Sequence, residues 1–453
     1  MPVAFLTLIR FLKNREVFIG KKLQRIKNDP IIIFQITTRS ATKTTPVVKR
    51  GIDSINRSCQ KIKYKNYQIS VVSDDPDDIR NLSQQNCKVL IVDKKFRTNA
   101  IRKGRALQYA VNYRRKVGQN APEYWIFHMD EESYVTSQTI LSLLEFIREK
   151  GGRIAIASEG PIFYPLKFES ANFITAIAES VRPFTCYHCV SHMTNPPPMH
   201  MHGSNLLVRS DIEDTIGWDF GPTLAEDEIF GYKIYEKYGS KSLGWHGGIL
   251  LEQPPLNIKD HFMQRRRWIL GRLQNIARFP LVHRFKITFE LITYFLVFVC
   301  GIMSPILFIY SQIVLNVPIL SSSIAQINYQ ESNLDTTTWV IKAFNTTIAS
   351  HPIVHTLLNG KPIEIITSSM LLFSSTVWLL SYQIGLSMNL RYSRVNSTRR
   401  VLFHLEALIL CPVIGVVETF PAFCAIIEYH LKNRIHKTRR TQNYEYDFYV
   451  VNK

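Results

Sequence analysis

The chain has 453 residues, which is enough for about two or three domain-sized units with a sizeable core. Its 55 Lys and Arg against 36 Asp and Glu leave a formal charge of +19, so we expect an anionic partner. Nucleic acid is not expected, because the chain lacks the aromatic-interleaved basic motifs of nucleic-acid-binding modules. Long apolar runs after about residue 286 favour membrane lipids instead.

Residues 1–30 are predicted to form a basic amphipathic segment on a membrane surface. Met1–Leu12 is apolar but shorter than the roughly 20 residues that a spanning helix needs. Cations follow this apolar stretch, whereas a signal peptide carries them before it.

Residues 31–257 alternate short apolar, β-rich runs with stretches of helical spacing. This alternation predicts an α/β fold whose mostly parallel sheet is covered by helices on both faces. Ligands on such sheets bind at the carboxyl ends of the strands. The absence of a G-x-G-x-x-G motif and of a P-loop disfavours dinucleotide dehydrogenases and NTPases. The predicted strands are Ile31–Thr37, Tyr67–Ser73, Lys88–Val92, Tyr124–Met129 and Arg153–Ala157, with helices over Ile101–Lys116 and Ser137–Lys150.

The C-terminal part is predicted to be membrane-associated, beginning with an amphipathic interface helix over 258–285 and continuing with a membrane region over 286–430. The third apolar segment of that region contains prolines and three glutamates, so we expect a broken, re-entrant or interfacial element that does not cross. The positive-inside rule then leaves the basic tail, 431–453, on the cytosolic side, together with the catalytic domain. The two expected spanning helices and the third segment are 288–316, 365–390 and 401–429.

Two acidic clusters are candidates for chemistry. Asp130-Glu131-Glu132 directly follows a predicted strand, where carboxylates at i and i+2 can bind Mg²⁺ against a substrate's phosphates. Ala225-Glu226-Asp227-Glu228 opens a helical stretch, where a carboxylate could accept the proton of an attacking hydroxyl. Alternatively, both clusters are acidic first turns that suit a helix dipole.

The spacing Q-x-x-R-W places Gln264, Arg267 and Trp268 on one helix face. Arginine suits a pyrophosphate leaving group and tryptophan can stack beneath a sugar ring, although a lipid-bound basic helix has the same pattern. Asp74–Asp78 is a candidate for contact with a nucleotide or, alternatively, a plain turn. The basic cluster 102–105, with Arg105, could neutralise phosphate or be ordinary surface charge, and 202–205, with Asn205, is a candidate acceptor site.

The seven cysteines are an odd number and some lie in apolar segments, so a disulfide framework is not expected. Cys186-x-x-Cys189, with histidines at 188, 192, 200 and 202, contains zinc-binding residue types. Its spacing matches no standard zinc finger, and three prolines at 196–198 indicate a flexible loop, so zinc is not predicted.

The order of these motifs resembles the inverting family 2 glycosyltransferases, which have a GT-A (Rossmann-like) fold, and is closest to the egghead-type β-1,4-mannosyltransferases. The resemblance covers nearly the whole chain from about Ile31. It is carried by ITTRS at 36–40, VVSDD at 71–75, KGRALQYA at 103–110, WIFHMDEE at 125–132, AEDEIF at 225–230, QRRRW at 264–268 and DFYVVNK at 447–453.

This resemblance implies a role for each matching position. Asp227 is the implied general base, and Asp130 and Glu132 are the implied ligands of Mg²⁺ or Mn²⁺. Many family members have Asp where this chain has Glu132, and their N-terminal membrane spans are missing here. The other implied contacts are Asp74, Gln264, Arg267 and Trp268 with the donor, and Asn205 and Trp268 with the acceptor. Arg105 remains a candidate for the donor phosphate from its position alone.

The resemblance further implies GDP-mannose as donor, a glycolipid acceptor and a single metal-assisted displacement that leaves a β-linkage. One alternative is a processive polysaccharide synthase that uses a UDP-sugar, for which three apolar segments are few. A non-catalytic membrane scaffold would not need the intact acidic set, and a transporter would need more spans.

Overall fold

The computed structural model describes residues 29–39, 41–149, 155–194, 201–292 and 362–439. The N-terminal membrane-surface segment, most of the expected span at 288–316 and the end of the basic tail lie outside these residues.

A seven-stranded sheet organises the first half of the chain, in the order β3-β2-β1-β4-β7-β5-β8. β1 pairs in parallel with β2 and β4, and β2 with β3, so these four strands end at one edge. β7 runs antiparallel between β4 and β5. The prediction of a mostly parallel α/β sheet is therefore confirmed. The strands are β1 Ile31–Thr37, β2 Tyr67–Ser73, β3 Lys88–Ile91, β4 Tyr124–Asp130, β5 Ala157–Glu159, β7 Leu206–Arg209 and β8 Leu243–Trp245, and a second sheet pairs β6 Ile162–Phe163 with β9 Leu250–Leu251.

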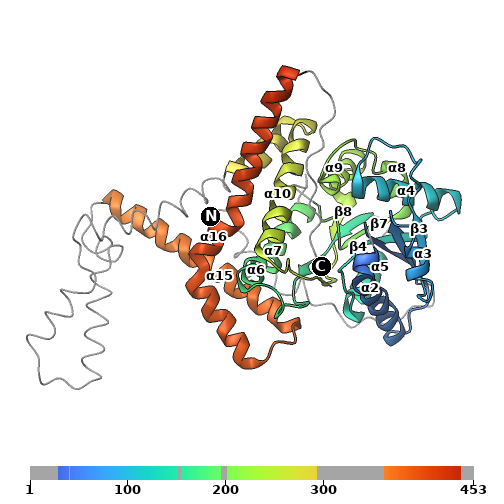
Figure 1. The fold of residues 1–453 in the computed structure, drawn as a ribbon, viewed down its shortest axis with the longest axis horizontal. Coiled ribbons are helices and arrows are strands. Elements are labelled where there is room, and N and C mark those ends of the chain that lie inside the picture. Colours follow the sequence, from blue (N-terminus) through green and yellow to red (C-terminus); the bar gives the residue numbers. More distant parts are fainter. Residues whose placement is uncertain (1–28, 40, 150–154, 195–200, 293–361, 440–453) are drawn as a thin grey trace, which may run out of the picture.

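Helices cover both faces of the sheet (Figure 1). α2 (Ala41–Lys61) and α5 (Ser137–Glu149) share one hydrophobic cluster with the strands. α4 (Arg102–Lys116) and α8 (Ser210–Ile216) share the cluster on the opposite face. Three layers with two cores result, as an α/β fold requires.

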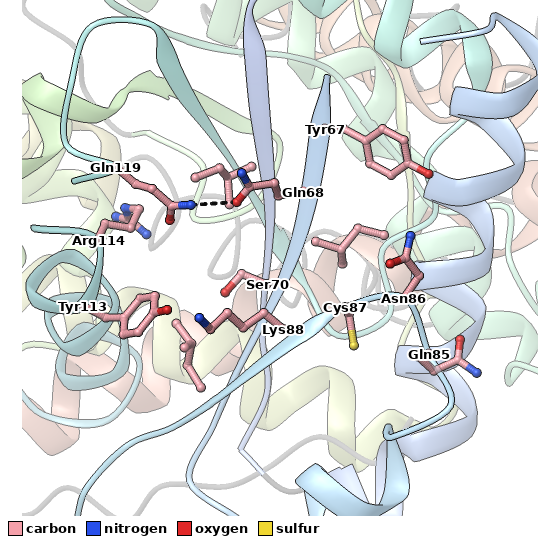
Figure 2. A pocket seen from close by; sticks show the side chains of 13 residues that line it. Tyr67, Gln68, Ser70, Gln85, Asn86, Cys87, Lys88, Tyr113, Arg114 and Gln119 are labelled. Carbon is pink, nitrogen blue, oxygen red and sulfur yellow. Dashed lines mark hydrogen bonds between the residues drawn. The ribbon is translucent and has the colours of Figure 1, made fainter. Parts of the chain in front are cut away.

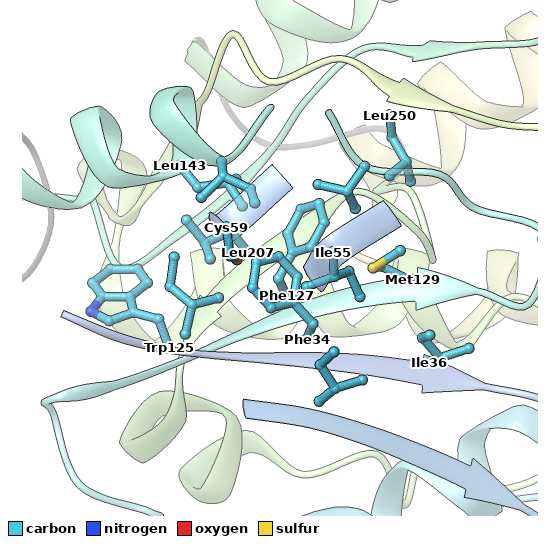
Figure 3. Close-up of a cluster of buried hydrophobic side chains, with 14 of the residues drawn as sticks. Phe34, Ile36, Ile55, Cys59, Trp125, Phe127, Met129, Leu143, Leu207 and Leu250 are labelled. Carbon is cyan, nitrogen blue, oxygen red and sulfur yellow. The ribbon is translucent and has the colours of Figure 1, made fainter. Parts of the chain in front are cut away.

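Alternate residues of β1 supply the two cores, because successive side chains of a strand point to opposite faces. Phe34 and Ile36 pack on the α2 side, where the rings of Phe34 and Phe127 meet edge to face at 5.7 Å (Figure 3). Ile33 belongs to the cluster on the α4 side. The strand is buried on both faces, which explains its continuous apolar sequence.

The fifth strand was predicted over Arg153–Ala157, of which residues 153–154 lie outside the described residues, and β5 spans Ala157–Glu159. Ser158 and Glu159 are polar and yet fully buried, so the apolar run did not indicate that the strand continues to Glu159.

Long helices follow the sheet domain. α10 (Ile258–Asn275) packs along α16 (Ser397–Arg439), and α15 (Pro362–Tyr392) packs against α7 (Val181–Thr194) (Figure 1). Between α10 and the end of the described segment, residues 281–292 are also helical.

The expectation of a broken or re-entrant element over 401–429 is wrong, because α16 is one continuous helix of 43 residues. Two of the glutamates that argued against a membrane crossing are paired with arginines of α10. Arg265 Nε lies 3.0 Å from Glu418, and Arg266 Nη2 lies 2.5 Å from Glu428. A paired carboxylate costs less to bury than a lone one, so these two glutamates argue less strongly against a crossing.

Among the described residues, one stretch, Val413–Leu431 of α16, is long and apolar enough to cross a membrane. The helical prediction for 365–390 agrees with α15, while a crossing there and an interfacial position of α16 remain predictions.

A buried ion pair joins α4 to α8, and side chains of β1 and β4 contact the same two residues. Arg114 Nη2 donates to Glu213 Oε2 at 2.6 Å, and Arg114 also donates to Gln35 of β1. Glu213 accepts a further hydrogen bond from Trp218 Nε1 at 2.6 Å, and His128 Nε2 lies 3.2 Å from it. Burial alone would raise the pKa of Glu213, but Arg114 and His128 lower it to about 2.

We expect Arg114→Met to lower the free energy of unfolding by about 3–5 kcal/mol, because it leaves a buried carboxylate without its cation. Thermal unfolding of the purified chain in detergent measures this loss. The matched control is Arg115→Met, whose partially exposed pair with Asp214 should contribute under about 1 kcal/mol. Equal shifts in the two variants would contradict the assignment of the buried pair as a structural tie.

Candidate active site

Lys103, in the first turn of α4, lies where the carboxyl ends of the parallel strands converge. Its Nζ donates to Asp130 Oδ1 at the end of β4, at 2.5 Å, and to the carbonyl oxygen of Gly203 at 2.9 Å. Burial lowers the pKa of Lys103, but Asp130, Glu226 and Asp227 outweigh burial and raise it. The ammonium therefore stays protonated among three carboxylates.

Asp227 lies in the first turn of α9 (Glu226–Tyr238) and is partly buried. The loop at Gly203 packs so closely that a Cβ there would lie 2.7 Å from Asp227 Oδ2 and 3.1 Å from Lys103 Nζ. Burial and the neighbouring Glu226 raise the pKa of Asp227 to about 7, against the opposing effect of Lys103. A carboxyl group with this pKa can exchange a proton near neutral pH.

The two predicted metal ligands, Asp130 and Glu132, differ in their exposure to solvent. The side chain of Asp130 is 37% exposed and faces the site through its bond with Lys103. Glu132 is only 4% exposed. Glu131, which lies between them, accepts a hydrogen bond from Thr38 Oγ1 at 2.6 Å.

Glu252 is a further carboxylate near Asp130 that the sequence did not indicate. Its Oε1 accepts hydrogen bonds from Ser204 at 2.7 Å and Ser133 at 3.2 Å. Burial, followed by the charge of Asp130, raises its pKa to about 7. Two oxygen-rich side chains thus approach the same place, which is the ligand type that Mg²⁺ and Mn²⁺ prefer.

Asp74 directly follows β2 and Arg105 lies on α4. Both were predicted to contact the donor, and their side chains form an ion pair. Arg105 Nη1 is 3.2 Å from Asp74 Oδ1, and its Nη2 donates to the carbonyl oxygen of Asp93 at 2.6 Å. Burial raises the pKa of Asp74, and Arg105 and Arg39 oppose that rise. A carboxylate and a guanidinium at this edge offer both an acceptor for hydroxyl groups and a partner for phosphate.

The Q-x-x-R-W face of α10 is tied to neighbouring helices. The Trp268 ring is partly exposed and has the guanidinium groups of Arg182 and Arg265 at 4.3 and 4.4 Å. Gln264 Oε1 accepts a long hydrogen bond of 3.4 Å from Arg265. Arg267 also interacts with other residues of the protein. Arg182 in turn lowers the pKa of Glu252, so this face borders the acidic site.

The cations of α10 were expected at a membrane surface, but several form ion pairs inside the protein. Arg265 bonds Glu179 of α6 (Phe173–Glu179) at 2.7 Å. Arg272 pairs with Glu228 at 3.3 Å and with Glu290 at 2.9 Å. Packing against α16 and α9 therefore decides where these side chains point.

Asn205, expected to line an acceptor site, has no exposed surface. Its Nδ2 donates to the carbonyl oxygens of Pro161 and Gly248 at 2.8 and 2.9 Å, and its φ of 56° lies in the left-handed region. The side chain thus holds the backbone behind the Gly203 loop. Arg102, with φ 55°, is strained in the same way directly before Lys103, and such strain often lies beside functional groups.

Lys103 was within the basic cluster that the sequence singled out, but phosphate binding was assigned to Arg105. The position of Lys103 in the first turn of a helix that follows a strand could have identified it as a site residue. Glu252 gave no signal, because it comes to the site through the pairing of Leu251 with Tyr134, a residue far away in the sequence.

A pocket of about 360 Å³ lies elsewhere, at the start of β2 and β3 (Figure 2). Gln119 Nε2 donates to Gln68 Oε1 across it at 2.8 Å, and Lys88 and Tyr113 line it as well. It contains none of the predicted site residues and lies at the wrong end of the strands for a ligand site of this fold class.

Comparison with known proteins points to one family. Residues 125–327 match the model of glycosyl transferase family group 2. Beta-1,4-mannosyltransferase egh of Drosophila melanogaster is 25% identical over 264 residues, 54% of this chain and 52% of that protein. Beta-1,4-mannosyltransferase bre-3 of Caenorhabditis elegans is 25% identical over 269 residues, 56% of this chain and 55% of that protein. The chain spans about half the length of these curated relatives.

Among solved structures, a mannosyltransferase from Pyrobaculum calidifontis in complex with GDP-Man and Mn²⁺ has a TM-score of 0.42 and 12% identity, over 92% of this chain and 98% of that chain.

If Asn205 holds the backbone, Asn205→Ala should lower the free energy of unfolding by about 2–5 kcal/mol, from lost hydrogen bonds and left-handed strain. Asn205→Gly is the matched control, since it loses the same bonds without the strain and should be about 1 kcal/mol more stable than the alanine variant. Thermal unfolding compares the three proteins. Unchanged stability in both variants would return Asn205 to the acceptor role.

Proposed function

We propose that this chain is an inverting hexosyltransferase that moves mannose from GDP-mannose onto a membrane-associated glycolipid in β-linkage, because residues 125–327 match the model of glycosyl transferase family group 2, as the motifs predicted. The observation that carries the proposal is Asp227, whose pKa is raised to about 7 beside Lys103 and the Gly203 loop. The family match and the mostly parallel sheet support a GT-A fold for residues 31–257.

In the proposed mechanism, Asp227 accepts the proton of the acceptor hydroxyl as the new glycosidic bond forms. The nucleoside diphosphate leaves from the opposite face of the anomeric carbon, which inverts its configuration in one displacement. Lys103 lies beside Asp130 and offsets negative charge where the diphosphate would bind. Asp74 and Arg105 are the proposed partners of the nucleotide, and Gln264, Arg267 and Trp268 those of the donor phosphate or the acceptor sugar.

The carboxylate ligands at this edge of the sheet fit a hard divalent cation. Asp130 exposes its carboxylate, and the pKa of Glu252 is raised by burial and, after burial, by the charge of Asp130, which a cation would offset. Asp130 would hold Mg²⁺ or Mn²⁺, with Glu132 or Glu252 as the second carboxylate. When bound, the ion would neutralise charge on the donor diphosphate.

Exposed apolar side chains support the proposed membrane association. Leu281, Phe285 and Ile409 are 79%, 74% and 75% exposed, on residues 281–292 and on α16. Apolar surface of this kind on helices is typical of contact with lipid. We place the catalytic domain on the cytosolic side, where nucleotide sugars are made.

A donor panel tests the proposed reaction. Purified full-length chain with Mg²⁺ or Mn²⁺ and a glycolipid acceptor should transfer mannose from GDP-mannose and use UDP-glucose and UDP-GlcNAc poorly. Product configuration, measured by NMR, should be β. A clear preference for a UDP-sugar would refute the proposed donor and move the chain towards the polysaccharide synthases, and full activity in excess EDTA would remove the metal role.

Asp227→Asn should lower kcat by about 10²–10⁴-fold and leave donor affinity nearly unchanged, because the carboxylate acts on the acceptor's proton. The acceptor's proton can be taken only by the ionised group, so kcat/KM should rise with pH through about 7 and level off above it. Glu236→Gln is the control, since Glu236 lies on the same helix, half exposed and paired with Lys233. Transfer by the Asn variant within tenfold of wild type, with the pH limb retained, would assign the base to another group.

A further inference from the structure

A second cluster of ligand-type side chains lies on the other side of the Gly203 loop from Asp227. It consists of Glu159 at the end of β5, Cys189 on α7 and His202, whose ligand atoms all lie within 4.8 Å of one another. The Cys186 thiol, one helical turn before Cys189, hydrogen-bonds with the Cys189 thiol. None of these four side chains has a part in the proposed sugar transfer.

The distances suit a tetrahedral site. Cys189 Sγ lies 3.6 Å from His202 Nε2. Zinc bonds of about 2.3 Å to sulfur and about 2.0 Å to nitrogen, opened to a tetrahedral angle, separate these two atoms by roughly 3.5 Å. On the other side of the ring, Glu159 Oε2 lies 3.6 Å from His202 Nδ1 and accepts the backbone N–H of His202 at 2.8 Å. One ligand atom from each of the three residues lies within 4.8 Å of the other two.

Glu159 is a buried carboxylate without a balancing cation. It has no exposed surface, and its Oε1 has no hydrogen-bond partner. In the part of the chain that the structure describes, no Lys or Arg forms an ion pair with it. Without a cation, burial raises the pKa of Glu159 and favours its neutral acid form, and a bound divalent cation would stabilise the carboxylate form instead.

We propose that Glu159, Cys186, Cys189 and His202 form a binding site for a soft divalent cation of the zinc class, separate from the cation expected at Asp130. Thiolate and imidazole ligands select zinc, whereas the carboxylates around Asp130 suit Mg²⁺ or Mn²⁺. Binding displaces the thiol protons to solvent, because the thiolate is the ligand form. The Cys-x-x-Cys spacing did not indicate zinc, because Glu159 lies far from it in the sequence and matches no finger pattern.

The proposed ion would join three segments, namely β5, α7 and the loop that begins at His202. The next residue of that loop, Gly203, packs against Asp227 and Lys103. The proposed metal site therefore positions the Gly203 loop against Asp227 and Lys103. This inference does not depend on the identity of the sugar donor.

The test measures metal content on the purified full chain, prepared under reducing conditions with Mg²⁺ present throughout. Mass spectrometry of the metals should find about one zinc per chain, and replacement by Co²⁺ should produce the absorption band of a cobalt–thiolate bond. Cys189→Ser and Glu159→Gln should each lower the zinc content at least fivefold. Cys59→Ser is the matched control, because Cys59 is another buried free thiol, packed in the α2 core.

If a variant fails to fold, the unaltered chain still decides the question. A zinc-selective chelator should lower its thermal midpoint, and added Zn²⁺, but not Mg²⁺, should restore it. A chain that takes up neither Zn²⁺ nor Co²⁺ after reconstitution would overturn the proposal. A Cys186–Cys189 disulfide in chain prepared without reductant, together with unchanged metal content in Cys189→Ser, would overturn it in favour of a redox pair.

Discussion

The charge balance around Lys103 is the interaction on which the rest of this site depends. One ammonium group faces Asp130, Glu226 and Asp227, and these carboxylates keep it protonated despite burial. In return, the charge of Lys103 opposes the rise in the pKa of Asp227. Because Lys103 also bonds the carbonyl oxygen of Gly203, the same group positions the loop between α9 and the buried Glu159 cluster. Geometry and protonation state are therefore coupled through one side chain.

A second set of charges fixes the long helices to the sheet domain. Arg265 of α10 bonds Glu179 of α6 and Glu418 of α16, and His261 lies between the same two carboxylates at 3.1 and 3.2 Å. Buried pairs of this kind specify which helices meet even where they add little net stability. Trp268, on the same helix, is thereby held beside Arg182 at the border of the acidic site. The helix that was expected to lie on lipid thus also connects the proposed membrane region with the catalytic domain.

Much of the sheet domain could be predicted because its signals are local. Four strands and the helices α4 and α5 follow from apolar runs and helical spacing, and the acidic residues at their ends mark the edge where ligands bind. The prediction failed where burial and polarity disagree. Ser158 and Glu159 are polar and yet buried in β5, and Pro412 and Pro421 lie within the continuous helix α16, so residue type there did not mark the end of an element.

The sequence by itself determined the fold class, the family resemblance and the choice of Asp74, Asp130 and Asp227 as candidate residues, since each follows from a pattern within a few positions. Only the tertiary structure decided which groups surround them. Glu252 reaches Asp130 because Leu251 pairs with Tyr134, and the ligand atoms of Glu159, Cys189 and His202 come within 4.8 Å of one another although the three residues lie apart in the sequence. These contacts depend on which distant segments pack together. The periodicity of a sequence indicates local structure and does not predict that packing.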